Sequence, residues 1–175
     1  FGKINLGLRY VSDKYSLENY QIEQYIDNTQ MVNSKTTFIT AEYLKTFSKI
    51  ELKAKTENFI FGDNKSNMFS SSVILKLKNN NFFTANYKLF SSIPNYNFLL
   101  YRSNYENYNW NNQFDNSITN SISLGLKLNE IIDLDLDLIS VKKHIQFEKI
   151  VNDLADSGEY SILPAQHNGN LDILK

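Results

Sequence analysis

Residues 118–138, ITNSISLGLKLNEIIDLDLDL, contain the pattern that decides the fold. On both sides of Asn129 and Glu130 apolar residues recur at alternate positions, interrupted at Asn120 and ending in Leu134, Leu136 and Leu138. Successive side chains of a strand point to opposite faces, so each half has one apolar and one polar face, whereas helical spacing would scatter these residues around the axis. The stretch therefore predicts two antiparallel strands joined by a short turn.

The same period of two recurs along most of the chain. It is found in five further segments, at residues 4–10, 39–44, 50–55, 69–78 and 83–89, and a last strand is expected at 171–174. Residues 17–28 fit either a short amphipathic helix or a mobile loop, and we favour a loop or extended strand ends. The chain is predicted to be all-β, with about eight antiparallel strands in a single unit spanning residues 1–175.

The connections between these segments alternate in length. Short turns are expected near residues 47–49, 79–81 and 129–130, and longer connections at about 12–36, 61–67, 91–111 and 148–169. The periodic stretches run to about 9–15 residues, longer than the usual globular strand and long enough for a tilted membrane strand. Phenylalanines also gather near the strand ends, as in interfacial girdles. These features predict an antiparallel up-and-down transmembrane β-barrel, in which all short turns lie at one end.

The alternation of apolar and polar residues alone does not show which face of the sheet contacts water. A lipocalin-like barrel places its apolar face inside, and a membrane barrel inverts this arrangement. Strand length, loop alternation and the uniformly bulky leucine rows favour the membrane barrel. A lipocalin-type Gly-x-Trp motif is also missing near the first strand, since Trp110 lies in the middle of the chain.

Composition excludes several other classes. The formal charge is −1, so no basic excess favours nucleic acid. The chain has no cysteine and two histidines, which excludes disulfide scaffolds and thiolate zinc sites and leaves little for any other metal site. The longest apolar run, at residues 98–101, is far too short for a membrane helix. We expect no metal and no cofactor.

The polar face of the predicted strands would line the lumen. Its expected lumen-lining residues are Arg9, Glu42, Glu51, Lys53, Lys55, Glu57, Lys76, Lys78, Lys88, Lys127, Asp133, Asp135 and Asp137. Together with Lys3 they make eight basic and six acidic groups, which predicts a weak ion preference. The three aspartates fit either a cation-attracting patch or a wet strand face neutralised by lysines, and we favour the second.

Enzymatic chemistry is not expected. No Gly-x-Ser-x-Gly elbow or phosphate loop is present, and we expect His144 at a strand end and His167 in a loop. The residues of the long central connection could stack sugars or bases, but constriction or packing at the barrel mouth is the favoured interpretation. The expected constriction residues are Tyr101, Asn104, Tyr105, Tyr108 and Trp110.

Two segments resemble a known family. Residues 101–116, YRSNYENYNWNNQFDN, are similar to a recurring segment of the Bacteroidota "putative porin" family, and Pro164-Ala165-Gln166 resembles the P-x-Q element that follows it. The resemblance implies an outer-membrane barrel and brings no catalytic residues. The sequence has no signal peptide and stops within a strand, so we expect a fragment of a longer chain.

The expected function is a porin-like barrel of the Gram-negative bacterial outer membrane that lets small hydrophilic solutes diffuse passively. Its expected partners are outer-membrane lipid, these solutes and other outer-membrane proteins, but no nucleic acid. The alternatives are a structural barrel subunit without an open pore and, with less support, a soluble lipocalin-like carrier.

Overall fold

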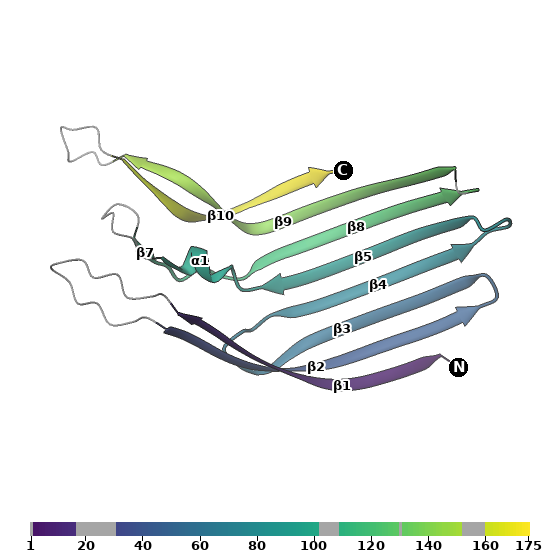
Figure 1. Cartoon of the computed structure of the whole chain (residues 1–175), viewed down its shortest axis with the longest axis horizontal. Coiled ribbons are helices and arrows are strands. Elements are labelled where there is room, and N and C mark those ends of the chain that lie inside the picture. The colour runs from purple at the N-terminus through teal and green to yellow at the C-terminus, as the bar shows by residue number, and fades with distance from the viewer. Residues whose placement is uncertain (1, 17–30, 102–108, 130, 152–159) are drawn as a thin grey trace.

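The computed structural model describes residues 2–16, 31–101, 109–129, 131–151 and 160–175. Eight long strands form one antiparallel sheet in which each strand pairs with its neighbours along the chain (Figure 1). They are β1 (Lys3–Ser16), β2 (Met31–Phe47), β3 (Ile50–Gly62), β4 (Asn67–Lys76), β5 (Phe82–Ser92), β8 (Ser117–Leu128), β9 (Ile132–Val151) and β10 (Tyr160–Leu174). The prediction of an all-β antiparallel chain with about eight strands is confirmed. The sheet is open, because its order runs from β1 to β10 without a described pairing between these two strands.

Residues with left-handed backbone form the tight turns at one end of the sheet. Ser48, Asn79, Asn80 and Asn129 all have positive φ, between 43° and 58°. Asparagine tolerates this conformation better than most residues, because its short polar side chain can bond the nearby backbone. The turns between β2 and β3, β4 and β5, and β8 and β9 all lie at this end, which we call the short-turn end (Figure 1).

The opposite end, called the long-loop end, differs from the sequence prediction at the link between β3 and β4. Only residues 63–66 separate these strands, so the connection is shorter than expected. Gly62 has a φ of 122°, and the Asp63 amide donates to the carbonyl of Lys35 at 3.2 Å. In return, the Lys35 amide donates to the Asp63 carboxylate at 2.9 Å. These bonds hold the turn against β2.

Strands also extend into ranges that the alternation assigned to long loops. β1 continues to Ser16 and β2 begins at Met31. Residues 17–28, where the sequence allows a helix or a loop, lie outside the described residues. β9 continues to Val151 and β10 begins at Tyr160. The expectation that His167 lies in a loop was wrong, because His167 is part of β10 and pairs with His144.

The connection between β5 and β8 contains structure of its own. It holds a single helical turn, α1 (Tyr96–Leu99), and a small hairpin of β6 (Leu100–Tyr101) and β7 (Trp110–Asn111). We call residues 93–116 the insertion. In Figure 1 its described part lies beside the sheet at the long-loop end.

Few described residues are buried. Phe38 and Leu100 are the buried large apolar residues, and Ser34 and Thr36 are the buried polar ones. Phe38, Thr36 and Ser34 follow one another on a single face of β2, near its beginning at the long-loop end. The sheet therefore has no apolar core of the kind formed by two packed layers, and both of its faces are largely open.

Candidate functional site

The strand register places the charged residues together on one face of the sheet, which we call the polar face. Residues directly opposite each other in neighbouring strands share a face, and so do residues two apart in one strand. Glu42 pairs with Lys55, and Lys127 with Asp133, and the other strands continue the same alternation. The residues of the polar face that the sequence singled out are Arg9, Glu42, Glu51, Lys53, Lys55, Glu57, Lys76, Lys88, Lys127, Asp133, Asp135 and Asp137. Lys78 is the exception, because β4 ends at Lys76 and Lys78 lies in the following turn.

Several of these charges form ion pairs. The Nζ atom of Lys53 lies 2.8 Å from Oε1 of Glu51, and that of Lys55 lies 3.1 Å from Oε1 of Glu42. Arg9 binds both carboxylate oxygens of Glu57. The side chains of Lys53 and Lys55 are about half exposed, so solvent screens both pairs and they add little to stability. The ion pairs of the polar face are therefore only partly buried, and Lys53 and Lys55 remain accessible from outside the sheet.

The other face, which we call the apolar face, carries rows of large hydrophobic side chains. Leu6 and Leu8 of β1 are 76% and 74% exposed, and Leu134 of β9 is 59% exposed. The rows continue through the intervening strands, for example in the Val73–Ala85 and Leu124–Leu136 pairs. Contiguous apolar surface of this extent is rare on soluble monomers and usually meets a partner or a membrane.

The insertion packs on the polar face at the long-loop end. Tyr15 of β1 donates from its hydroxyl to the Oδ1 of Asn97 at 3.0 Å and stacks on Tyr96. Phe98, the residue after Asn97, contacts the ring of Phe147 in β9, with ring centroids 5.6 Å apart. One helical turn thus contacts both β1 and β9, although five strands lie between them in the sheet. The sheet is therefore curled around its polar face at this end.

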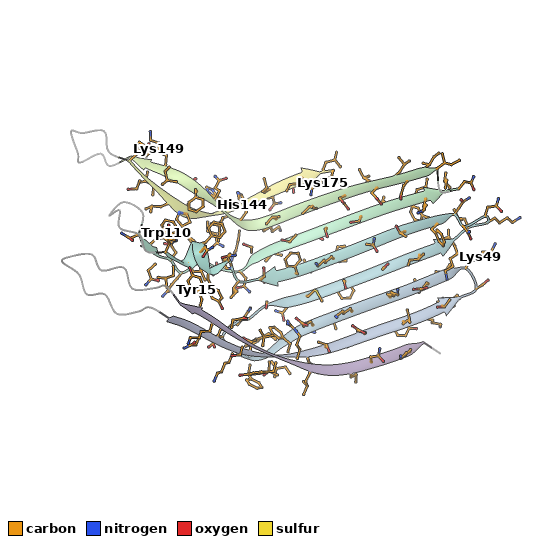
Figure 2. All side chains as sticks on the ribbon, viewed as in Figure 1. Tyr15, Lys49, Trp110, His144, Lys149 and Lys175 are labelled. Carbon is orange, nitrogen blue, oxygen red and sulfur yellow. The ribbon has the colours of Figure 1, made fainter. Side chains whose placement is uncertain are left out.

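Two of the five expected constriction residues are in the described part of the insertion. Tyr101 and Trp110 stack on each other with ring centroids 4.7 Å apart. The indole of Trp110 also makes a T-shaped contact with the ring of Phe147 and donates to the carbonyl of Asn97 at 3.0 Å. Figure 2 shows Trp110 and Tyr15 at the same end of the sheet, far from Lys49. Asn104, Tyr105 and Tyr108 lie outside the described residues.

A second set of contacts fixes the end of the insertion to β9 and β10. Gln166 accepts a hydrogen bond from the Asp115 amide at 2.9 Å and donates to the Asp115 carbonyl at 2.8 Å. Lys143 of β9 forms an ion pair with the Asp115 carboxylate at 2.6 Å. This gives the P-x-Q element a structural role, because its glutamine holds the insertion in place.

Sequence reasoning missed the anchors Tyr15, Asn97 and Phe147. A usable signal was present for Tyr15, since it shares its face of β1 with Arg9. The alternation gave no such signal for Phe147, because Lys143 interrupts it with a positive φ. Aromatic residues that continue a polar row at one end of a sheet indicate that something packs there. The sequence did not indicate what that was.

The two histidines stand on neighbouring strands. Their rings stack with centroids 5.2 Å apart, and Nε2 of His167 lies 2.9 Å from Oε1 of Glu148. Over the residues that the structure covers, no group of three acidic or histidine side chains is arranged to hold a metal ion. No helix among those residues is long and apolar enough to cross a membrane.

The family comparison covers the whole chain. A family model described as "Putative porin" matches residues 1–175. No curated protein and no solved structure matches the chain.

Proposed function

Because the chain belongs to the family described as "Putative porin", we propose that it forms part of the wall of an outer-membrane barrel through which small hydrophilic solutes diffuse passively. The observation that carries this proposal is the division of one sheet into a charged face and an exposed apolar face. In a membrane barrel the apolar face meets lipid, and the polar face lines water. The mechanism is passive, since a hydrated wall removes the barrier that hydrocarbon presents to polar solutes.

The open edges of the sheet fit a wall segment. A sheet in hydrocarbon must pair every backbone N–H and C=O group, so β1 and β10 require further strands beside them in the membrane. Barrels of eight strands fill their own interior, and open aqueous channels have roughly 16–18 strands. We therefore propose that the eight strands are part of a larger barrel.

In this proposal the insertion forms a constriction. It lies on the polar face and joins β1 to β9 through Tyr15 and Phe147, so it stands in the path of solutes at the long-loop end. Stacking of Trp110 on Tyr101 stiffens it. The solutes admitted would be those small enough to pass beside it.

A structural barrel without an open pore is the second candidate, and close packing at one point of the insertion favours it. Leu100 is only 4% exposed, so this segment packs closely. The lipocalin-like alternative has less support, because the insertion packs against the polar face and leaves the apolar face uncovered.

Two measurements on the intact protein test the proposal. Heat-modifiable gel mobility in the outer-membrane fraction is the result expected for a membrane barrel, and recovery as a soluble, detergent-free protein would contradict it. Conductance in planar lipid bilayers then separates the two candidates, because an open pore gives stepwise current increases and a plugged structural barrel gives none.

A further inference from the structure

A hollow of about 490 Å³ lies on the sheet and is lined by residues of β1 to β5. Four lysines line it, Lys3, Lys53, Lys55 and Lys88, against one glutamate, Glu42. None of the residues that line the hollow belongs to the insertion.

The register explains why the sheet is hollow here. Lys55 and Lys88 both pair with Ser70 from opposite sides, so the three residues form one row across β3, β4 and β5. The next row has the same form, with Ser72 between Lys53 and Asn86. The α-carbons of the outer residues in each row are about two strand spacings, roughly 10 Å, apart. A small serine between two long side chains leaves a gap with a hydroxyl at its floor.

The charge in this hollow is only partly neutralised. Lys53 and Lys55 are paired with Glu51 and Glu42, respectively. Lys88 has no carboxylate partner in the described part of the chain, and its Nζ lies 4.8 Å from the centroid of the Phe90 ring. An ammonium held over a ring keeps donors for a further acceptor. The hollow thus combines excess positive charge with hydroxyl donors.

Half of the acidic groups on the polar face lie away from the hollow, whereas Glu42, Glu51 and Glu57 lie on β2 and β3. Asp133, Asp135 and Asp137 form a row on β9, which β8 separates from β5. The charges of the whole face nearly cancel, yet four lysines outnumber two glutamates on β3 to β5, whereas β9 carries this acidic row. The basic hollow would attract anions, and the aspartate row of β9 would attract cations.

We propose that this hollow is a binding subsite for small oxyanions, such as inorganic phosphate or the phosphate and carboxylate groups of permeating solutes. The inference rests on the proposed function, because it assigns a substrate class to the same polar face. Lysine binds phosphate as a point charge with three donors, and Ser70 and Ser72 supply hydroxyl donors beside it. Lys55 and Lys88, whose α-carbons are about 10 Å apart, can approach one oxyanion from opposite sides.

The test measures binding of inorganic phosphate to the intact, detergent-folded protein by ³¹P NMR line broadening. Lys88→Gln removes an ammonium of the hollow that has no carboxylate partner among the described residues, and Lys49→Gln removes the same charge from the turn after β2, outside the hollow. We expect Lys88→Gln to weaken phosphate binding about ten- to a hundredfold, as for loss of one charge-assisted hydrogen bond, and Lys49→Gln to leave it unchanged. Absence of broadening with the wild-type protein, or equal loss in both variants, would overturn the subsite.

Conductance measured on the same preparations separates this inference from the proposed function. Phosphate binding with the expected variant pattern but no conductance would refute the open pore and leave the subsite standing. Conductance without Lys88-dependent phosphate binding would refute the subsite and leave the pore standing. Block of the chloride current by phosphate, relieved in Lys88→Gln, would support both.

Discussion

The apolar face provides the most informative substitution, Leu136→Arg. Leu136 lies opposite Leu124 in the middle of a leucine row and is 42% exposed. It is four residues into β9, which starts at Ile132. At about 3.4 Å per residue and a tilt of about 40°, this is roughly 10 Å from the short-turn end, close to the centre of an apolar band about 25 Å tall.

An arginine at the bilayer midplane costs about 2–4 kcal/mol in membrane barrels, which lowers the folding equilibrium constant about 30- to 700-fold. The assay is urea-driven unfolding of the intact protein from phospholipid vesicles. The matched control is Ser123→Arg, which adds the same charge to the polar face beside Asp137. We expect the control to change stability by no more than about 0.5 kcal/mol, as for a hydrated surface position.

The reasoning would be refuted if Leu136→Arg unfolded at the same urea concentration as the wild-type protein, or if Ser123→Arg lost as much stability as Leu136→Arg. Either result would mean that the leucine row does not meet hydrocarbon.

Three further substitutions probe the turn and the insertion. Gly62→Ala should destabilise the barrel by about 1–3 kcal/mol, because φ is 122° and the added Cβ would collide with the carbonyl of Lys35. Gly169→Ala, where the Cβ would meet nothing within 4 Å, is its control in the same urea titration. Trp110→Ala should raise single-channel conductance and admit larger neutral solutes, since its ring contacts stiffen the insertion; an unchanged size limit would argue against a constriction there. Gln166→Ala removes both hydrogen bonds between this side chain and the insertion backbone, so limited proteolysis should cut the insertion faster than in the wild-type protein. Equal cleavage rates would show that Gln166 does not hold it.

The strands and their faces were predictable because one physical rule governs both. Alternation of period two assigns every residue of a regular strand to a face, so rows such as Lys53 with Lys55 and Leu134 with Leu136 follow directly from the sequence. The tight turns were predictable as well, because Asn79, Asn80 and Asn129 belong to a residue type that accepts positive φ.

The extension of β9 and β10 toward the long-loop end was not predictable, because irregularities interrupt the alternation of apolar and polar residues. β10 contains Pro164 and a register shift between His167 and Asn170, and β9 has a positive φ at Lys143. A proline and a bulge both count against a strand in the sequence, although bulges commonly occur in barrel walls.

The packing of the insertion also depends on contacts that the sequence does not encode locally. The bond between Tyr15 and Asn97 joins residues 82 positions apart, and that between Gln166 and Asp115 joins residues 51 apart. Alternation places Tyr15 on the polar face, but it does not say which of many aromatic and amide side chains will meet it. The hollow at Ser70 was missed for a related reason, since it depends on register across three strands.

The central claim is that one face of this sheet meets hydrocarbon and the other meets water. Nitroxide labels at Leu124→Cys and Ser123→Cys, adjacent residues on opposite faces of β8, test it in the intact protein reconstituted in lipid, with any cysteine outside this cysteine-free sequence removed. The label at position 124 should relax with dissolved oxygen and be shielded from a water-soluble nickel chelate, and the label at position 123 should show the reverse. Equal access of the chelate to both labels, or the opposite pattern, would contradict the account.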